Sequence, residues 1–375
     1  MAAQPPLRVA IDANPLIGER SGIGHVTARL LEGLAPRADV EVTGYAITRT
    51  GRRDLAGILP PGVRPATSWI PARVVHPLWA RGGWPSIERW TGPVDVVHSP
   101  NFIAPPAKVP VIVSVHDVAF AHSPELCRPE AAQLVPLLRR AIARGVVIHT
   151  GSDHVAQEIR ECFDVPPERV VRVYSGIATP ARAGDAARGH ARAGGDRYLL
   201  AIGTIEPRKN LPGLVRAFDV VAASDPDVRL VIAGGDGWGV EALDAAVAAS
   251  PFATRIARLG YVSDAHHADL LAGASLLAYP SLYEGFGHPP FEVMAAGVPV
   301  VTTTAGSIPE VVGDAAVLVA PGDDAALAAA LARVLTDDAL RADLVARGHA
   351  RARAFPWSSA IDGFVDLYRT VAAGR

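Results

Sequence analysis

Two glutamates separated by seven residues are the first candidates for chemistry in this sequence. Glu284 and Glu292 stand in SLYEGFGHPPFEVMAA, residues 281–296, which follows a short apolar run. The glycines between them loosen the backbone, and the proline pair is tolerated only near the start of a helix. The segment therefore predicts a tight loop and then a helix that begins near Pro289. Glu284 falls in the loop and Glu292 in the first helical turn.

A helix start of this kind favours phosphate binding. The backbone N–H groups of Phe286, Gly287 and His288 would lie at the positive end of the helix dipole. Carboxylates repel phosphate but accept hydrogen bonds from sugar hydroxyls, so two of them suit a ligand with sugars on both sides of a diphosphate. A nucleotide sugar has this layout. The structural alternative is that Glu292 only stabilises the helix start. The glycine turn and Glu284 favour the binding interpretation.

A basic pair, Arg208 and Lys209, follows another predicted strand. The pair lies in GTIEPRKN, residues 203–210, after the apolar run 198–202 and before a helix that Asn210 is able to cap. Cations at the carboxyl end of a strand are well placed to neutralise a leaving diphosphate, which stabilises the transition state without a metal. The alternative is a pair of solvated loop residues. The position at a strand end favours the catalytic role.

The N-terminal half offers weaker signals. Gly22 and Gly24 lie in SGIGH, residues 21–25, where a backbone without side chains lets a phosphate approach closely. Glycines after a first strand also serve packing. His116 ends the apolar run 111–115 and is able to bind a substrate hydroxyl, although an isolated histidine is more often structural.

Three other motifs fail on their position. Asp225-Pro226-Asp227 resembles a metal-binding DxD motif but precedes its strand, so a turn is expected. His266 and His267 are adjacent and not one helical turn apart, which implies no ligand pair. The run GGDGWG, residues 234–239, resembles a dinucleotide loop, but no matching turn follows the first strand of its domain. We therefore predict no metal site and disfavour an NAD oxidoreductase.

The elements that must position these residues form two series. Short β-branched runs alternate with Ala- and Leu-rich stretches of helical period, which is typical of parallel sheets wrapped by helices. Strands are expected over 7–11, 40–47, 94–98, 111–116, 146–150 and 170–173, and again over 198–202, 228–233, 256–259, 276–279, 298–302 and 317–319.

The break between the two series predicts two domains. Residues 179–196 are Ala-, Gly- and Arg-rich without apolar period and read as a linker. The chain therefore predicts an α/β protein of two doubly wound domains, residues 1–178 and 197–357, with a cleft between them and ligands beyond the carboxyl ends of the strands. The final amphipathic stretch, residues 358–375, fits against either domain.

Composition sets limits on partners and location. With 36 basic and 38 acidic residues among 375, the chain is near neutral, which favours a small-molecule partner and gives no reason to expect nucleic acid. Two cysteines are too few for a disulfide framework and fit a reducing cytoplasm. The N-terminus lacks a signal-peptide pattern. No apolar run approaches the roughly 20 residues that span a bilayer. Membrane contact would be weak and peripheral, at the inner face.

Two surface features are left open. The Pro- and Arg-rich segment 69–90 contains four tryptophans: Trp69, Trp79, Trp84 and Trp90. Two interpretations stay open for them, the lining of an acceptor groove and ordinary packing within loops. An apolar stretch is flanked by four arginines: Arg128, Arg139, Arg140 and Arg144. We favour a solvated helix face for them over contact with an anionic membrane.

The glutamate pair, the GTIEPRKN block, the SGIGH loop and the His-Asp pair at 116–117 together resemble the retaining glycosyltransferase family 4, also called glycosyl transferases group 1. The resemblance covers nearly the whole chain and is most specific over residues 279–312. It implies the GT-B architecture, in which two Rossmann-like domains face each other. The C-terminal domain would hold the nucleotide and the N-terminal domain the acceptor. Residues 358–375 would return to the N-terminal domain.

The resemblance also implies roles for the residues that would hold the donor. Glu284 would contact the donor sugar and Glu292 the ribose hydroxyls. The backbone at 286–287 would bind the phosphates, and Arg208 with Lys209 the diphosphate.

The remaining implied contacts come from other loops. Tyr261 and Val262 would lie near the base. Gly22 and Gly24 would approach the phosphate, and His116 would lie beside the donor sugar.

Two positions depart from the family pattern. Some relatives have an arginine where Thr204 stands, which leaves diphosphate binding to Arg208 and Lys209. Others have arginine or tyrosine in place of His25, which affects contacts on the acceptor side. The local sequence resembles mannosyltransferase-like members of the family, so GDP-mannose is the leading candidate for the donor. The resemblance also implies retention of the anomeric configuration and no obligatory metal.

The leading function is transfer of a sugar from a nucleotide-diphosphate donor to a hydroxyl of a glycan, lipid or small molecule, as in polysaccharide biosynthesis. A sugar-nucleotide epimerase of the same fold is the alternative among enzymes, because it needs the same diphosphate cleft. A non-catalytic sugar-nucleotide-binding protein is the alternative outside enzymes, and a basic pair beside two carboxylates argues against it. In the leading hypothesis, Glu284 and Glu292 bind opposite ends of one donor molecule, and neither needs to transfer a proton.

Overall fold

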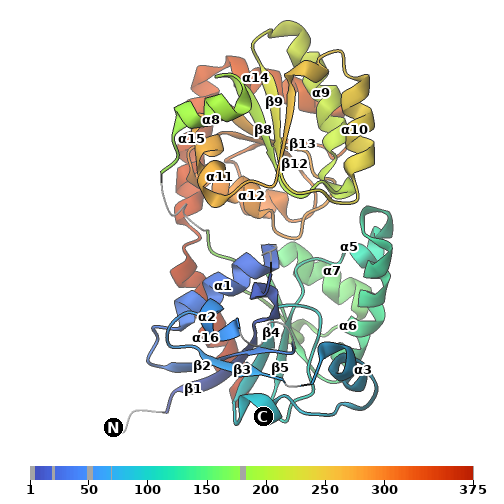
Figure 1. Ribbon diagram of the computed structural model, residues 1–375, viewed down its shortest axis with the longest axis vertical. Helices are drawn as coiled ribbons and strands as arrows, with labels where there is room; N and C mark the ends of the chain where they lie inside the picture. The colour runs from blue at the N-terminus through green and yellow to red at the C-terminus, as the bar shows by residue number, and fades with distance from the viewer. Residues whose placement is uncertain (1–4, 19–21, 49–53, 69, 178–182, 375) are drawn as a thin grey trace. The chain divides into compact units, whose positions relative to one another are not determined.

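The computed structural model describes residues 5–18, 22–48, 54–68, 70–177 and 183–374 (Figure 1). The chain forms two compact units. Unit 1 comprises residues 1–121, 130–176 and 357–375, and unit 2 comprises residues 122–129 and 177–356. Each unit contains one sheet whose described strands are all parallel. The two doubly wound domains predicted from the alternating pattern are therefore confirmed.

Unit 1 has its strands in the order β3-β2-β1-β4-β5-β6-β7. Their bounds are β1 (Leu7–Asp12), β2 (Val40–Ala46), β3 (Arg64–Thr67), β4 (Val96–Ser99), β5 (Val111–Ser114), β6 (Val147–Thr150) and β7 (Val170–Arg172). The edge strand β3 was not predicted, since its sequence RPAT has no apolar alternation. Pro65 is tolerated there because an edge strand leaves one side of its backbone without a ladder partner.

The helices of unit 1 surround this sheet. They are α1 (Gly22–Leu34), α2 (Leu55–Ile58), α3 (Ala72–Gly82), α4 (Glu88–Thr91), α5 (Ala119–His122), α6 (Leu134–Ala143), α7 (Asp153–Phe163) and α16 (Trp357–Ala373), with short 3-10 turns η1 (Asn14–Leu16), η3 (Pro129–Gln133) and η4 (Pro167–Arg169). The C-terminal helix α16 packs against α1 and β4 (Figure 1). Its apolar face, including Ile361 and Phe364, is buried in the core of the unit.

A buried chain of hydrogen bonds ties α16 to the middle of this sheet. The Tyr368 hydroxyl lies 2.7 Å from His98 Nδ1, and His98 Nε2 lies 2.8 Å from Ser114 Oγ. Ser114 Oγ in turn lies 2.8 Å from His149 Nδ1, and His149 Nε2 donates to the carbonyl of Val173 at 3.2 Å. The carbonyl can only accept, so with both imidazoles neutral it fixes the position of each proton along the chain. Burial lowers the pKa of His149 to about 3 and that of His98 well below its usual value.

Unit 2 has its strands in the order β10-β9-β8-β11-β12-β13. Their bounds are β8 (Tyr198–Ile202), β9 (Arg229–Ala233), β10 (Ile256–Gly260), β11 (Leu276–Tyr279), β12 (Val300–Thr303) and β13 (Val317–Val319). All six were predicted, because they are short, mostly apolar runs. The four inner strands are buried, whereas the edge strands β10 and β13 are only partly buried. The apolar side chains of the strands form a core with Leu214, Phe218 and Leu331 from the covering helices.

The helices of unit 2 include one that was not predicted. They are α8 (Ala186–Ala193), α9 (Leu211–Ser224), α10 (Val240–Ala249), α11 (Asp264–Gly273), α12 (His288–Ala295), α13 (Ile308–Val312), α14 (Asp324–Thr336) and α15 (Asp338–Arg353), with η2 (Pro124–Leu126), η5 (Pro207–Lys209) and η6 (Ala253–Arg255). The predicted linker 179–196 is wrong over α8, which packs closely on α11. Asp185 caps α8, and Gly189 faces the Asp269 carbonyl where a Cβ would leave only 2.2 Å.

Each sheet has one point at which the strand order reverses direction. In unit 1 this switch point lies between β1 and β4, and in unit 2 it lies between β8 and β11. Loops that follow these strands diverge to opposite faces of the sheet and leave a crevice where ligands of doubly wound folds bind. The two switch points are therefore where functional side chains are expected.

Candidate active site

The structure brings three of the predicted site residues together at the switch point of unit 2. Arg208 and Lys209 lie in η5, which follows β8, and Glu284 lies in the loop that follows β11. Lys209 Nζ donates to Glu284 Oε1 at 2.6 Å, and Arg208 donates through one terminal nitrogen to Glu284 Oε2 at 3.0 Å. Each carboxylate oxygen of Glu284 therefore accepts a hydrogen bond from one cationic side chain.

Tyr279 completes this cluster and was not predicted from the sequence. Its hydroxyl donates to Glu284 Oε1 at 2.8 Å and accepts from Lys209 Nζ at 2.5 Å. The ammonium also lies 4.7 Å from the centre of the Tyr279 ring. As the last residue of β11, this buried tyrosine reads in the sequence as an ordinary core aromatic. No sequence motif distinguishes Tyr279 from a tyrosine that only packs in the core.

Glu206 forms the outer edge of the cluster. Its Oε2 accepts from Arg208 Nε at 2.7 Å, so the guanidinium bridges two carboxylates. Arg208 is half-buried, whereas Lys209 and Glu284 are 8% and 5% exposed. The four charges sum to zero, which is the balance that burial requires.

Burial and charge act in opposite directions on this cluster. Burial raises the pKa of Glu284, but the charges of Lys209 and Arg208 outweigh it and bring that pKa down to about 2. Burial also lowers the pKa of Lys209, with Arg208 adding to the effect and Glu284 opposing it. Burial first, and then the Glu284 charge, raise the pKa of the Tyr279 hydroxyl. Glu284 is therefore an anion and Tyr279 a neutral donor.

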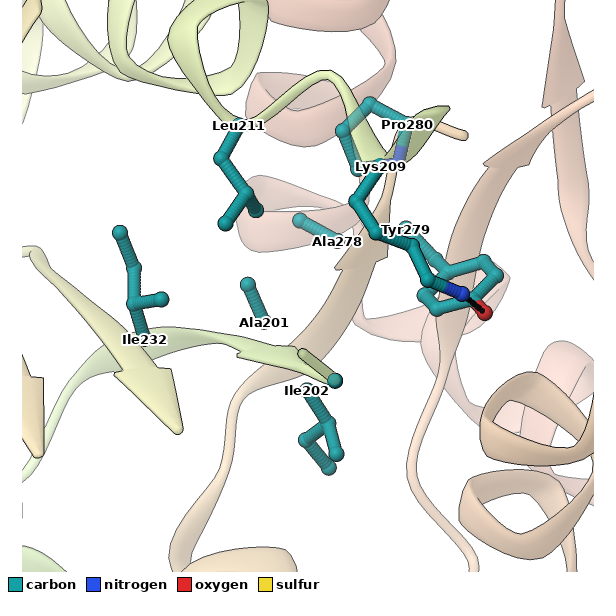
Figure 2. Close-up of a pocket in the computed structure, with 9 residues that line it drawn as sticks. Ala201, Ile202, Lys209, Leu211, Ile232, Ala278, Tyr279 and Pro280 are labelled. Atoms are coloured by element: carbon teal, nitrogen blue, oxygen red, sulfur yellow. Dashed lines mark hydrogen bonds between the residues drawn. The ribbon is translucent and has the colours of Figure 1, made fainter. Parts of the chain in front are cut away.

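Lys209 lines a small hollow at the carboxyl ends of the strands. Figure 2 shows the lysine chain at one side of the lining residues, with its ammonium beside the Tyr279 hydroxyl. The lining is apolar apart from these two groups and is made by Ala201, Ile202, Gly203, Leu211, Ile232, Ala278 and Pro280. The apolar side chains of the lining disfavour movement of the ammonium away from the cluster, because a charge is costly to bury without polar partners.

Backbone contacts fix the loop that carries Glu284. The N–H of Leu282 donates to the Arg208 carbonyl at 2.7 Å, which joins the loop to η5. The N–H of Ser307 donates to the Glu284 carbonyl at 3.0 Å. Gly306 packs against the same carbonyl, where a Cβ would leave only 2.2 Å, and its φ of +57° also favours glycine. The carboxylate is thus held from both neighbouring loops.

The predicted loop and helix start are confirmed at α12, which begins at His288 with a proline in its first turn. Gly287 has φ of +89°, and a Cβ there would come within 2.6 Å of Ile308. The backbone N–H groups of Phe286 and Gly287 have no partner in the described part of the chain. Glu292 lies on α12 and is half-buried. This geometry offers two donors at a helix start.

One local prediction about this region was wrong. Asn210 does precede α9, but it makes no side-chain hydrogen bond to the helix and has φ of +49°. The tight turn after η5 needs a left-handed residue, and asparagine tolerates that conformation better than most residues. Asn210 therefore shapes the turn and does not cap the helix.

The glycine run 234–239 packs backbone against backbone. Gly234 lies so close to the Gly203 carbonyl that a Cβ would leave 1.9 Å. The N–H of Ile205 donates to the Gly235 carbonyl at 3.0 Å, and the N–H of Gly239 donates to the Ile205 carbonyl at 3.0 Å. These glycines hold the loop after β8 against the loop after β9.

The remaining donor-side candidates lie at the same edge of this sheet. Tyr261 and Val262 follow β10, and Tyr261 is 75% exposed. No contact in the structure joins either residue to the Glu284 cluster. Asp225 accepts from the backbone N–H groups of Asp227 and Val228, which confirms a turn at the DPD motif.

The candidates of the N-terminal half lie in unit 1. Gly22 opens α1 and has open space around it, whereas Gly24 is buried within the helix. His116 follows β5, and its Nε2 donates to the Pro100 carbonyl at 2.8 Å. Burial lowers the pKa of His116, so the ring is neutral and Nδ1 is an acceptor.

Most of the tryptophans and arginines left open by the sequence pack within the protein. Trp79 is buried, donates to the Pro85 carbonyl at 2.8 Å and lies edge-on to Trp90; Trp84 is 66% exposed; Trp69 lies outside the described residues. The arginines also make internal contacts, as Arg139 does with the Phe163 ring and Arg144 with a backbone carbonyl. Among the described helices, none is both long and apolar enough to cross a membrane.

Comparisons with known proteins agree with this fold. Residues 20–180 match the family model described as Glycosyltransferase Family 4, and residues 185–351 match the model described as Glycosyl transferases group 1. The O-antigen chain mannosyltransferase B of Escherichia coli is 32% identical over 283 residues, which are 73% of this chain and 74% of that protein.

Solved structures share the architecture at low sequence identity. Sucrose-phosphate synthase from Thermosynechococcus elongatus is 18% identical, with a TM-score of 0.76 over 98% of this chain and 100% of that one. Anabaena HepE in complex with UDP and glucose is 17% identical, with a TM-score of 0.73 over 97% and 100%. Two doubly wound units with this likeness define the GT-B class of glycosyltransferases. This chain belongs to glycosyltransferase family 4, the glycosyl transferases group 1, and is a hexosyltransferase.

Proposed function

We propose that this glycosyltransferase moves mannose from GDP-mannose to a hydroxyl of a glycan, lipid or small-molecule acceptor, with retention of the anomeric configuration. The observation that carries the proposal is the cluster of Lys209, Arg208 and Glu284 at the switch point of unit 2. The mannosyltransferase name of the Escherichia coli relative supports mannose as the sugar. The UDP and glucose in the Anabaena complex support a nucleotide-sugar donor.

Lys209 and the start of α12 would bind the diphosphate. The ammonium has three N–H groups, and the bonds to Tyr279 and Glu284 use two of them. The third N–H group would donate to a phosphate oxygen, and the backbone N–H groups of Phe286 and Gly287, which have no partner among the described residues, would donate to the same diphosphate. Charge-assisted hydrogen bonds of this kind are strongest where water is excluded. They would stabilise the nucleoside diphosphate as it leaves, and we propose that no metal is obligatory for this step.

The carboxylates would bind the sugars on either side of the diphosphate. Glu284 stays ionised because its pKa is about 2, so it is an acceptor for donor-sugar hydroxyls at any ordinary pH. Glu292, half-buried on α12, would accept from the ribose hydroxyls. Tyr261 and Val262 would contact the base from the loop after β10. The acceptor nitrogen of His116 and the glycines Gly22 and Gly24 would serve the substrate from unit 1.

Thermal stabilisation by a panel of sugar nucleotides tests the donor assignment. GDP-mannose, GDP-fucose, UDP-glucose, UDP-N-acetylglucosamine and dTDP-glucose would be compared, with and without EDTA. A ligand that binds only the folded state stabilises it by about 2.7 kcal/mol at a hundred times its dissociation constant. We expect GDP-mannose to give the largest shift, unchanged by EDTA. A larger shift with a UDP-sugar would refute GDP-mannose and leave the transferase standing.

We also propose that the protein works in the cytoplasm, with at most peripheral contact at the inner face of the membrane. Cys127 and Cys162 are thiols and form no disulfide, which a reducing compartment preserves. Exposed Val74 and Leu78 on α3, with Trp84 after it, are side chains that suit a lipid interface. Sedimentation with anionic vesicles should carry down a minor, salt-sensitive fraction, and no sedimentation at low salt would contradict the peripheral contact.

A further inference from the structure

The switch point of unit 1 has an acidic side chain that no part of the proposed function uses. In unit 2 the candidate site lies beyond the ends of the two strands that flank the switch point, β8 and β11. The corresponding strands of unit 1 are β1 and β4. Asp12 is the last residue of β1, and Ser99 is the last residue of β4. Asp12 thus lies where a doubly wound unit binds its ligand.

Only one oxygen of Asp12 is satisfied within the described residues. Its Oδ1 accepts twice from Asn14, from the backbone N–H at 2.9 Å and from Nδ2 at 2.6 Å. Its Oδ2 has no hydrogen-bond partner, and no described cation forms an ion pair with it. Asp12 as a whole is only 8% exposed, but Oδ2 is not among the fully buried polar atoms that lack a partner, so solvent reaches it. Burial raises the pKa of this carboxyl to about 6 in spite of the two bonds from Asn14.

The surroundings of Asp12 are polar and match a hydroxylated ligand. The Tyr45 hydroxyl on β2 lies 3.3 Å from Ser99 Oγ on β4, although β1 lies between these two strands in the sheet. Asp12 is paired with Tyr45 in the register of β1 and β2, and burial, with the charge of Asp12 second, raises the pKa of Tyr45. His116 is bonded to the carbonyl of Pro100, the residue after β4. Acceptor groups for hydroxyl protons therefore gather at this end of the sheet.

We propose that Asp12 binds a hydroxyl of the acceptor substrate through Oδ2. This inference rests on the proposed function, since it assigns the acceptor of the same transfer. Oδ2 has no donor from the described residues and is the carboxylate oxygen that remains accessible, so a neutral ligand hydroxyl is able to donate to it. A phosphate is repelled by the same charge. The site therefore selects a polyhydroxylated, uncharged group, which is the chemistry of a sugar.

A purely structural role for Asp12 would use Oδ1 alone. The bonds to Asn14 hold the turn that starts η1, and an amide oxygen accepts them equally well. Asp12→Asn therefore keeps the turn and replaces only Oδ2, by an NH2 group that cannot accept. The matched control is Asp95→Asn, which removes an aspartate of unit 1 that precedes β4 and pairs with Arg8.

The experiment measures initial rates with GDP-mannose and with methyl or octyl α-D-mannopyranoside as acceptors. Asp12→Asn should raise the acceptor KM at least tenfold and leave the donor KM within twofold, whereas Asp95→Asn should change neither. An unchanged acceptor KM in a variant that still transfers sugar would overturn the inference and leave the proposed function intact. Equal rises in both constants with a lowered unfolding temperature would also overturn it, in favour of a structural role. A wild-type protein that transfers nothing would refute the proposed function itself.

Deoxygenated acceptors test the same bond without any variant. Methyl α-D-mannopyranosides that lack one hydroxyl at a time would be compared on the wild-type protein. A site built to bind a hydroxyl rejects the analogue that lacks it. We expect one deoxy position to lose tenfold or more in kcat/KM, and that loss to disappear in Asp12→Asn. If no single hydroxyl matters by more than twofold, or if the loss persists in the variant, Asp12 does not bind the acceptor.

Discussion

Lys209 and Glu284 are 75 positions apart in the chain, yet Lys209 Nζ lies 2.6 Å from Glu284 Oε1 inside unit 2. The segments that follow the neighbouring strands β8 and β11 bring them together, and the pair is almost fully buried. Breaking one side of a buried pair leaves an uncompensated charge, which typically costs about 3–5 kcal/mol. The pair is therefore both a stability element and the base of the proposed donor site.

Removing the Lys209 charge should abolish most of the transfer. Lys209→Met keeps the length of the chain that lines the apolar hollow but removes all three N–H donors. We expect kcat to fall about 100-fold or more, since one electrostatic donor of this kind is worth about 2.7–4 kcal/mol. Lys108→Met is the matched control, because Lys108 is the other lysine of the chain and is exposed. Equal activity in the two variants, both folded, would show that Lys209 has no part in the reaction.

The Tyr279 hydroxyl should matter less than the lysine but measurably. Tyr279→Phe removes the group that accepts from Lys209 and donates to Glu284, without changing the ring packing. We expect about a tenfold fall in kcat, as the two charges lose a shared orienting partner. Tyr198→Phe loses a buried hydroxyl that bonds the Leu270 carbonyl away from the site. Tyr198→Phe should lower the free energy of unfolding and leave kcat unchanged. A similar loss of kcat in the two variants would count against a specific role for Tyr279.

Gly306 should be intolerant of a side chain because of its contact with Glu284. Gly306 and Gly313 share φ of +57°, but a Cβ at Gly306 meets the Glu284 carbonyl at 2.2 Å whereas one at Gly313 meets nothing closer than 3.6 Å. Gly313→Ala should cost about 1–3 kcal/mol from backbone strain, because φ of +57° with ψ of −130° is adopted almost only by glycine, and it should keep full activity. Gly306→Ala should cost more and lose most activity. Chemical denaturation with parallel rate measurements compares the two, and equal effects would argue against the loop contact.

Acid should destabilise unit 1 through its buried histidines. His98, His149 and His116 all have lowered pKa values, with burial as the main cause. In the unfolded chain these rings titrate near about 6.5, so below that pH the unfolded state binds more protons than the folded state. The free energy of unfolding should fall by up to about 1.4 kcal/mol per pH unit and histidine. Denaturation at pH 7.5, 6.5 and 5.5, followed by tryptophan fluorescence, measures it. A flat profile would contradict neutral, buried rings.

The Tyr368 hydroxyl should hold α16 to the sheet. Tyr368→Phe leaves His98 Nδ1 buried without a donor, which typically costs about 1–3 kcal/mol. We expect a lower midpoint of denaturation at pH 7.5 with unchanged KM for the donor. An unchanged midpoint would mean that the hydrogen bond adds no net stability.

Much of the fold follows from the sequence, because the inner strands of a parallel sheet are buried and form short apolar runs. The failures have physical reasons. Arg64–Thr67 pairs on one side only and needs no apolar alternation, so it gives no strand signal. The helix Ala186–Ala193 is short, and its stability comes from packing on α11, which is a tertiary contact.

The candidate site was predictable residue by residue but not as a cluster. Glycines, prolines and strand ends place Glu284, Arg208 and Lys209 at the edge of a sheet. The hydrogen bonds between these side chains depend on β8 and β11 being neighbours in the sheet. Local sequence patterns do not predict the order of strands in a sheet. Tyr279 and Asp12 were missed for the same reason, since each reads as the end of an ordinary buried strand.

The most direct test of the account is the reaction itself, followed by proton NMR. The wild-type protein would be mixed with GDP-mannose and octyl α-D-mannopyranoside, and the donor, the released nucleotide and the anomeric proton of any product would be observed together. The account predicts GDP and an α-linked dimannoside in equal amounts, with no change of the donor when the acceptor is left out. A β-linked product would contradict retention, and conversion of the donor to an epimer without acceptor would contradict transfer altogether.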